Sequence, residues 1–353
     1  MYLAIKEIKH NKFRYGLIIF TIFLVSYLIF FLTGLAFGLA NNNRSSIDNW
    51  HADNVVISQY ANDNLSSSEI QSSALPEISG SSADYAYLGQ MMGVASRKNE
   101  KKANISVFGI EFNKFLKPKL IQGRMPQKAN EVVVDNGLEA TKLGQKIKIN
   151  NVDEVYTVVG LTTGNKYTTS PVVYLRLADY QTLRYGPGSS NKKINAVVLK
   201  NSAGIKKETQ FTTLTTNELI NNIPGYAPEV KTFALMIGAL FVIIAFIVGI
   251  FMYILTIEKT AVYGVLRAQG ISGGTLVKSL IWESSLLGVA GIGLGIIADV
   301  ATAITLPAAV PFLNNALLVS GFSLVLLLMI ILGSLFSISK ILRVDPLDAI
   351  GGV

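Results

Sequence analysis

The residues best suited to ligand chemistry are Tyr226 and Glu229, three positions apart in the segment PGYAPEV. A phenol and a carboxylate at this spacing can both bind a metal or another polar ligand through oxygen. The same segment opens a long apolar run, and a carboxylate is favourable at the positive N-terminal end of a helix. The sequence alone favours this structural interpretation of Glu229 and leaves a ligand role open.

Few other residues are suited to catalysis. The chain has no cysteine, and its two histidines, His10 and His51, fall on opposite sides of the predicted membrane, so they cannot share a metal site. Neither the phosphate-binding pattern GxxxxGK followed by Ser or Thr nor the zinc pattern HExxH is present. We therefore expect no enzymatic activity, no intrinsic cofactor and no bound metal.

Two further carboxylates fall inside apolar runs, where ionisable groups are costly and often functional. Glu283 is expected one turn into the third run, and we favour a helix-start carboxylate near the positive end of the dipole. Asp299 lies near the other end of the same run. It faces either a partner helix or a water-filled cleft, and the sequence does not separate these two possibilities.

Four apolar segments must position these side chains. Each can cross a hydrocarbon core of about 30 Å, which needs about 20 residues of helix. The predicted spans are 15–40, 231–257, 280–305 and 316–339, and a polar stretch, 41–230, separates the first from the other three. Hydrophobic residues make up 50% of the chain, as expected for a membrane protein. The sequence predicts an α-helical membrane domain of four transmembrane helices (1+3) with an inserted extracellular α+β domain.

The basic residues follow a membrane topology rather than a nucleic-acid surface. They flank the cytoplasmic ends of the predicted spans at Lys6, Lys9, Lys12, Arg14, Lys259, Arg267, Lys278, Lys340 and Arg343. The short connection 306–315 has none. The positive-inside rule therefore predicts cytoplasmic termini, a cytoplasmic segment 258–279, and extracellular segments 41–230 and 306–315. We expect a multi-pass plasma-membrane protein whose partner is the lipid bilayer and not nucleic acid.

Short β-branched runs bounded by Gly, Asn, Asp or Pro predict strands in the inserted domain. They are ANISVFGI (103–110), EVVVDN (131–136), KIKIN (146–150), VYTVVGL (155–161), PVVYL (171–175) and NAVVLK (195–200). Helices are expected at 137–143, 177–183 and 216–222. Residues 44–75 are expected to form loops with short strands, and a short helix at 65–74 is predicted because Ser66 and Glu69 have capping-box spacing.

Gly34 and Gly38 lie four positions apart in the first span. This GxxxG spacing lets two membrane helices approach closely. It predicts a homodimer contact through these two glycines. The third span is also rich in glycine, which predicts tight helix packing there.

Four stretches together resemble one family, the MacB/FtsX-type ABC transporter permeases. LAIKEIKHNKFRYGLIIF (3–20) is similar to their cytoplasmic amphipathic elbow helix, assigned here to 1–14, and its entry into span one. IEKTAVYGVLRAQGISGGTLVKSLIWESSLLG (257–288) resembles their loop between spans two and three. ILRVDPLDAIGG (341–352) resembles their C-terminal tail, with Pro346 and Ala349 in the tail 340–353. LIQGRMPQKANEVVVDNGLEATKLGQKIKI (120–149), YTVVGL and PVVYL resemble their extracellular core domain.

The resemblance implies a permease that works as a homodimer with two copies of a separate cytoplasmic ABC ATPase, on which ATP and Mg are bound. It implies mechanotransmission, in which the ATPase moves the spans and outer domains, rather than a solute tunnel. The coupling role then falls on Glu258, Lys259, Tyr263, Leu266, Arg267 and Gly270. An ordinary amphipathic interfacial helix is the alternative for this loop.

Within that family, the compact length, the N-terminal segment and the ending RVDPLDAIGG are most similar to the haem-export group of HrtB and DevC-like permeases. This implies efflux of haem, taken laterally from the outer leaflet and held in an apolar cleft by an oxygen or nitrogen ligand. Glu229 and Tyr226 are the first candidates for that ligand. Tyr167, His51, Met91 and Met92 are weaker candidates because the sequence does not place the outer loops.

Two other functions stay open. One is an FtsX-like regulator that passes ATPase strokes to an extracellular cell-wall hydrolase, although such a regulator predicts a smaller outer domain. The other is export of antimicrobial peptides or lipids, although peptide-sensing relatives usually carry ten spans. The Lys- and Asn-rich, cysteine-free composition is typical of a Gram-positive bacterial membrane protein.

Overall fold

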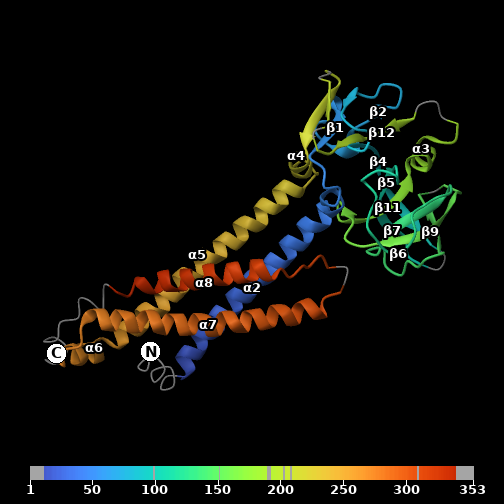
Figure 1. The fold of residues 1–353 in the computed structure, drawn as a ribbon. Coiled ribbons are helices and arrows are strands. Elements are labelled where there is room, and N and C mark those ends of the chain that lie inside the picture. Colours follow the sequence, from blue (N-terminus) through green and yellow to red (C-terminus); the bar gives the residue numbers. More distant parts are fainter. Residues whose placement is uncertain are drawn as a thin grey trace. The chain divides into compact units, whose positions relative to one another are not determined.

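A computed structural model describes residues 12–97, 100–150, 152–188, 192–201, 203–206, 209–307 and 310–338 (Figure 1). The chain forms two compact units. One is the inserted domain, Leu39–Glu229, and the other joins Met1–Gly38 to Val230–Val353. Most of the predicted elbow helix 1–14 and the tail 340–353 lie outside the described residues, as do His10, Pro346 and Ala349.

Four long apolar helices make up the membrane unit. α2 (Lys12–Asp48), α5 (Tyr226–Glu258), α7 (Gly273–Thr305) and α8 (Ala316–Leu335) are each long and apolar enough to cross a bilayer. A short helix, α6 (Thr260–Ala268), lies between α5 and α7 in the chain. The end of α2 and the first residues of α5 belong to the inserted domain. The predicted four-helix membrane domain with an inserted α+β domain is confirmed.

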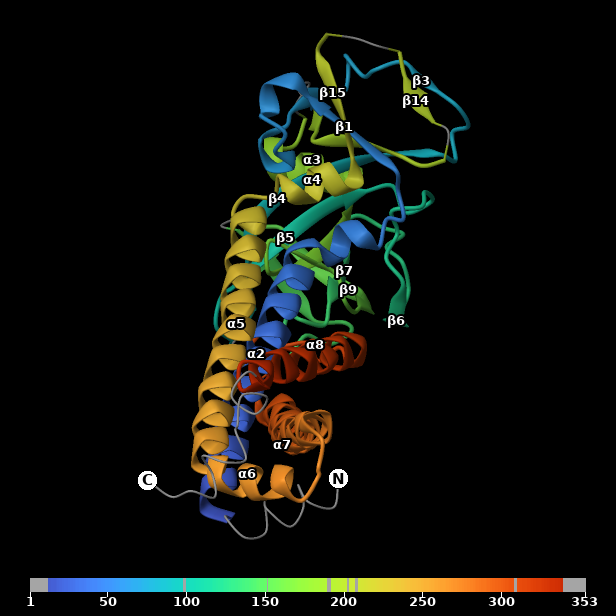
Figure 2. The ribbon, with the colours of Figure 1, turned by 90° about the vertical axis from the view of Figure 1, so that its left-hand side faces the viewer.

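Small residues let the helices of the membrane unit pack closely. Figure 2 shows α2 and α5 side by side, and α7 meets α2 through Gly291 and Gly295. A methyl group added to Gly291 would lie 2.5 Å from Ile22, and one added to Gly295 would lie 2.3 Å from the Ser26 hydroxyl. Lipid tails are as apolar as leucine, so such close van der Waals contact supplies much of the attraction between membrane helices.

The two glycines of the GxxxG spacing contact the chain's own segment between α7 and α8. A Cβ atom on Gly34 would lie 2.4 Å from the Phe312 ring, and one on Gly38 would lie 2.2 Å from the Pro311 carbonyl oxygen. The N–H of Leu313 donates to the Gly34 carbonyl at 3.1 Å. These two glycines therefore allow a close approach within one chain, and the homodimer contact expected at them stays a prediction.

Six strands of the inserted unit close into a ring. They pair in the order β4–β5–β11–β7–β9–β8 and back to β4. The β5–β11 and β7–β9 pairs are parallel, and the other pairs are antiparallel. The strands are β4 (Tyr85–Ser96), β5 (Ala103–Ile110), β7 (Glu131–Asp135), β8 (Lys146–Ile149), β9 (Val155–Thr162) and β11 (Ser170–Arg176). Closure leaves the ring without free strand edges.

Strand β4 is long enough to take part in a second set of pairings. Its first residues pair with β13 (Ala196–Leu199). β13 pairs in turn with β1 (Asn54–Ser58), and β1 pairs with β15 (Phe211–Thr215); all three pairs are antiparallel. The shorter elements are β2 (Ile70–Gln71), β3 (Ile78–Ser79), β6 (Leu120–Gly123), β10 (Lys166–Tyr167), β12 (Lys193–Ile194), β14 (Gly204–Ile205), η1 (Gln59–Ala61) and η2 (Leu65–Ser67). Helices α3 (Leu177–Tyr185) and α4 (Thr216–Asn221) complete the described elements of this unit.

The inserted unit has two main apolar cores. All six ring strands contribute to the first, which includes Val107, Val132, Ile147, Val158 and Val173. The second gathers the other faces of β5, β7 and β11 with β1, β13, α4 and the end of α2, and it includes Trp50, Phe108, Tyr174, Leu219 and Tyr226. The alternation of side chains along a strand makes two cores from one set of strands.

A tyrosine from α3 packs on a pair of glycines in the ring. Gly89 of β4 pairs in register with Gly109 of β5, and the Tyr180 side chain covers both. The Tyr180 hydroxyl donates to either the Gln90 carbonyl at 3.0 Å or the Asn195 side-chain oxygen at 2.8 Å. Burial raises the pKa of Tyr180, so the hydroxyl stays a donor at neutral pH. The absence of side chains at Gly89 and Gly109 therefore allows α3 to dock.

The sequence predicted all six named strands, as well as the helices at 177–183 and 216–222. The helix predicted at 137–143 is wrong, because the chain there forms turns. At 65–74 a single 3-10 turn, η2, takes the place of the predicted helix, and Asn64 rather than Ser66 caps it. The first helix also continues through 44–48, where loops were predicted. Ile47 of this turn is buried in the second core, and Arg44 and Asp48 form an i,i+4 ion pair.

We predict that Gly109→Ala destabilises the inserted unit by about 1–3 kcal/mol, because a Cβ atom there would lie 2.3 Å from the Tyr180 side chain. Urea unfolding of the purified protein measures the change in stability. Proteolytic cleavage of the inserted unit reports the unfolded fraction at each urea concentration. Gly204→Ala is the control, because its nearest contact is an ordinary 3.5 Å. Equal stability of the two variants would contradict the packing of Tyr180 on this glycine pair.

Candidate functional site

Tyr226 and Glu229 join residues from the end of α2 in one polar cluster within the inserted unit. We call it the Asn43 cluster, and its members are Asn43, Arg44, Asp48, Tyr226 and Glu229. Asn43 Nδ2 donates to Glu229 Oε2 at 3.3 Å, and Arg44 Nη1 donates to the Tyr226 hydroxyl at 3.3 Å. Arg44 also binds Asp48 through Nε and Nη2 at 2.7–3.1 Å. The two predicted ligand residues therefore share one site.

The two predicted ligands differ in accessibility. The Tyr226 side chain belongs to the apolar core, and only 7% of it is exposed. Glu229 is half-buried and lies in the first turn of α5, where its N–H donates to the Gly225 carbonyl. A carboxylate at this position interacts favourably with the helix dipole, as the structural interpretation of Glu229 requires. It is also accessible enough to bind a ligand, so the geometry is compatible with both interpretations.

The turn at residues 167–169 connects the Asn43 cluster to two weaker candidates. The N–H of Thr168 donates to the Asn43 carbonyl at 3.1 Å, and its hydroxyl donates to the sulfur of Met92 at 3.3 Å. Met92 is exposed, whereas Met91 points the other way and packs on the core inside the ring. Tyr167 is fully buried, and this burial raises its pKa to about 12. Of these candidates, Met92 alone has an exposed side chain near the cluster.

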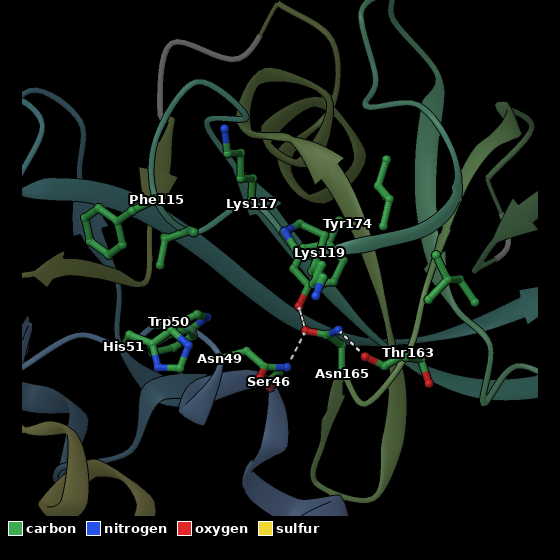
Figure 3. A pocket seen from close by; sticks show the side chains of 14 residues that line it. Ser46, Asn49, Trp50, His51, Phe115, Lys117, Lys119, Thr163, Asn165 and Tyr174 are labelled. Atoms are coloured by element: carbon green, nitrogen blue, oxygen red, sulfur yellow. Dashed lines mark hydrogen bonds between the residues drawn. The ribbon is translucent and has the colours of Figure 1, made fainter.

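His51 lies beyond the end of α2 and lines a separate pocket in the inserted unit (Figure 3). Its φ of 49° places it in the left-handed region, and its N–H donates to the Asp48 carbonyl, which ends the helix. The pocket has a volume of about 640 Å³. Its walls are formed by the end of α2, the segment 115–121 and the strand ends near Asn165 and Tyr174.

A polar network organises the far wall of this pocket (Figure 3). The side-chain oxygen of Asn165 accepts from the Tyr174 hydroxyl at 2.8 Å and from Asn49 Nδ2 at 3.1 Å. Asn165 Nδ2 donates to the Thr163 carbonyl at 2.9 Å. Burial raises the pKa of Tyr174 well above its ordinary value, so the phenol remains a donor. The network fixes the end of α2 to the sheet and makes a rigid wall.

The membrane unit has its own buried polar site, which we call the Lys259 cluster: Tyr15, Lys259 and Glu283. Lys259 Nζ donates to the Tyr15 hydroxyl at 2.8 Å and to Glu283 Oε1 at 3.2 Å. The Tyr15 hydroxyl also donates to Glu283 Oε1. The Glu283 side chain is 2% exposed and that of Lys259 is 14% exposed. The cluster therefore connects α2, the α5–α6 junction and α7 through charge-assisted hydrogen bonds.

Glu283 was favoured as a helix-start carboxylate, and that interpretation is wrong. Helix α7 begins at Gly273, ten residues before it, so Glu283 lies well inside the helix, where the dipole effect has faded. The carboxylate is stabilised by Lys259 instead. The sequence carried one signal for this pairing: a lysine directly after the second apolar run and a glutamate inside the third. Their contact depends on how the helices pack.

The residues predicted to couple to an ATPase fall on different sides of α6. Tyr263 is buried, and Leu266 packs against the membrane core, so both face the unit's own helices. Gly270, with a φ of 87°, ends α6 in a Schellman-type turn, in which Ile271 N–H donates to the Leu266 carbonyl. Glu258 pairs with Arg14 of α2. The sequence reasoning missed the exposed apolar face of α6.

That exposed face carries Val262 and Val265, which are 54% and 45% accessible. Three positions apart on a helix, they lie on the same side. The coupling residues predicted from the sequence do not include these valines, although their spacing opposite Tyr263 is visible in the sequence. They form an exposed apolar surface on the helix after the second span.

The segment Gly270–Gly274 also has the spacing G-x-S-x-G, the pattern of a hydrolase nucleophile elbow. Here it joins two helices, α6 and α7, whereas the elbow is a strand-to-helix turn. The Ser272 hydroxyl caps α7 by accepting from the Thr275 N–H at 3.3 Å. This serine is therefore a helix cap and gives no support to a hydrolase site.

Asp299 faces its own chain near the end of α7. The carboxylate is 1% exposed, and its Oδ2 accepts from Asn314 Nδ2 at 2.9 Å. Asn314 lies in the segment that also crosses Gly34 and Gly38. The sequence left a partner helix and a water-filled cleft open. In the structure, Asp299 contacts the non-helical segment between α7 and α8 of its own chain.

Comparison with known proteins decides the family. The chain is 30% identical over 366 residues to a protein named as a hemin transport system permease protein, HrtB, of Staphylococcus epidermidis, with 100% of this chain and 99% of that one covered. It is 30% identical over 360 residues to the HrtB protein of Staphylococcus haemolyticus, with both chains fully covered. The chain belongs to the HrtB family of ABC transporter permeases. It is a membrane-embedded permease subunit.

Similarities at lower identity were also found. An uncharacterised ABC transporter permease of Mycobacterium tuberculosis is 21% identical over 356 residues and 100% of this chain. No family model matches the chain. The periplasmic region of MacB from Actinobacillus actinomycetemcomitans aligns with 49% of this chain and 93% of its own, at 15% identity and a TM-score of 0.33. The extracellular domain of the transporter YknZ aligns with 42% of this chain and 83% of its own, at 10% identity and a TM-score of 0.30.

We predict that Lys259→Met destabilises the HrtB-family membrane unit by about 3–5 kcal/mol, because it leaves the Glu283 carboxylate buried without its cation. The double variant Lys259→Met/Glu283→Gln should recover most of that loss, since it removes both charges. Thermal unfolding in detergent measures both effects. Lys278→Met, an exposed lysine on α7, is the control. A single variant as stable as the wild type would contradict the buried pair.

Proposed function

We propose that this chain is the permease subunit of an ATP-driven exporter that takes haem from the outer leaflet of the plasma membrane and expels it. The observation that carries this proposal is the 30% sequence identity, over 99–100% of both chains, to permeases named for hemin transport. The topology supports it, since the positive-inside rule puts both termini and α6 in the cytoplasm and the inserted domain outside. Haem then meets the protein at the outer ends of α2 and α5.

The Asn43 cluster is the proposed haem entrance. A phenol or a carboxylate can supply the oxygen ligand that haem iron accepts. Glu229 is the accessible carboxylate, and Asn43 orients it through the 3.3 Å hydrogen bond. Arg44 provides a guanidinium for a haem propionate, and it holds the Tyr226 hydroxyl in place. A single oxygen ligand in a half-exposed site would hold haem loosely enough for release.

The ATP-dependent step is proposed to act at the opposite end of the same helices. A separate cytoplasmic ABC ATPase, in two copies on a permease homodimer, would bind and hydrolyse ATP. The exposed valines of α6 offer it an apolar surface, and the Lys259 cluster connects α6 to α2 and α7. α2 carries both Tyr15 and Asn43, and at 37 residues a straight helix is about 55 Å long. Movement at one end can therefore act on the haem entrance, as mechanotransmission requires.

A haem titration of the purified protein with its ATPase partner tests the export proposal. We expect a saturable Soret shift at a fixed ratio of haem to permease. Glu229→Gln should weaken haem binding by at least about tenfold, the equivalent of 1.4 kcal/mol, because it removes the anionic ligand. Tyr226→Phe should have a smaller effect, because the phenol is buried.

Glu77→Gln is the control for this titration, because Glu77 is an exposed carboxylate paired with the exposed Lys206, away from the Asn43 cluster. A shift that survives Glu229→Gln would move the haem site elsewhere on the protein. The absence of any saturable shift would refute haem as the substrate, and the chain would remain an ABC permease with another cargo.

We predict that Val265→Asp at least halves the amount of ATPase that co-purifies with the tagged permease. The charge would sit in the proposed apolar contact surface, and desolvating an unpaired carboxylate is costly. Because Val265 is exposed, folding of the permease should be unaffected. Val155→Asp, at a similarly exposed valine of the inserted unit, is the control. Unchanged co-purification would show that α6 does not bind the ATPase through this face.

A further inference from the structure

The pocket beside His51 lies in the inserted unit and shares none of the residues of the Asn43 cluster. Its volume of about 640 Å³ is in the range of small-molecule sites. Most of the lining is apolar, with Phe115, Leu116, Leu120 and Ile121 on one segment and Trp50 just after the end of α2. These walls suit the body of a flat or elongated apolar molecule, and the rigid network at Asn165 closes the far side (Figure 3).

The charged side chains that line the pocket have one sign. Lys117 and Lys119 line it from the same segment, and none of the 14 lining residues is an aspartate or glutamate. Both lysines are exposed, and the residues between and beside them, Leu116 and Pro118, are buried. This alternation anchors the segment while leaving two ammonium groups at the rim. Within the described part of the chain, neither lysine forms an ion pair with a carboxylate.

Two polar atoms in the pocket walls add hydrogen-bonding capacity. The hydroxyl of Ser46 and the indole N–H of Trp50 have no hydrogen-bond partner among the described residues. Unpaired buried polar atoms are rare in folded proteins. Both atoms are covered, however, so a ligand reaches them only after a small side-chain movement. The rim lysines and the apolar walls therefore decide the class of ligand.

We propose that this pocket binds an amphipathic organic anion. The apolar body lies against Phe115, Leu116 and Leu120, and the carboxylate or sulfonate group pairs with Lys117 and Lys119. A cationic molecule of the same shape is repelled by the two ammonium groups, and a small inorganic anion gains nothing from the apolar walls. The proposal stands on this pocket alone and does not depend on haem export.

The tryptophan content of the chain allows a direct test. The chain has only two tryptophans, Trp50 in the pocket wall and Trp282 on α7. Trp282→Phe therefore leaves Trp50 as the single fluorescence donor. Full-length protein in neutral-lipid nanodiscs is titrated with dansylglycine, an anion, and with dansylcadaverine, a cation with the same fluorophore. We expect saturable energy transfer from Trp50 to dansylglycine, and binding of dansylcadaverine that is at least about tenfold weaker.

Charge reversal at the rim completes the test. In the Trp282→Phe background, Lys117→Glu/Lys119→Glu should weaken dansylglycine binding by at least about tenfold. Lys142→Glu/Lys146→Glu is the matched control, with the same change in net charge at exposed lysines outside the pocket. Thermal unfolding checks that both variants fold. Equal transfer from the two dansyl compounds, or equal dansylglycine affinity in the two double variants, would indicate partition into the bilayer and overturn the proposal.

Discussion

The buried contact of Glu283 with Lys259 and Tyr15 constrains the whole membrane unit. A carboxylate removed from water must be paired and hydrogen-bonded, or its burial costs several kcal/mol. Its partners come from α2 and from the junction of α5 and α6, so three helices must meet at one depth. The small residues of α7 then decide how closely the helices approach, and Gly291 and Gly295 bring α7 against α2. Polar pairing sets the register, and close packing maintains it.

The inserted unit meets a different constraint, because one frame holds both the Asn43 cluster and the pocket beside His51. The closed ring of six strands gives that frame, and its two cores bury both faces of β5, β7 and β11. The end of α2 packs into the second core through Ile47, and Asn49, just after the helix, is tied to Asn165 of the sheet. The same helix end carries Asn43 and Arg44. The Asn43 cluster and the pocket beside His51 are therefore supported by one set of contacts.

Membership of the HrtB family makes this chain a permease subunit, and its proposed function is one of binding and movement. The residues that matter are then those that hold a cargo, connect helices or face a partner. The Asn43 cluster, the Lys259 cluster and the exposed valines of α6 each suit one of these roles. They lie near the ends of the apolar helices, because a charged group is least costly where a span meets water.

The sequence by itself determined the features that depend on local pattern. The apolar runs predicted four spans, the β-branched runs predicted six strands, and Glu229 was expected at the N-terminal end of a helix, where it lies in the first turn of α5. Tertiary structure alone decided which distant residues meet. Glu283 is hydrogen-bonded to Lys259, and Tyr167 is buried in a core. Gly34 and Gly38 contact Phe312 and Pro311 of the same chain. The physical reason is that periodicity fixes which face of an element is apolar, whereas partners are chosen by the packing of whole helices and sheets.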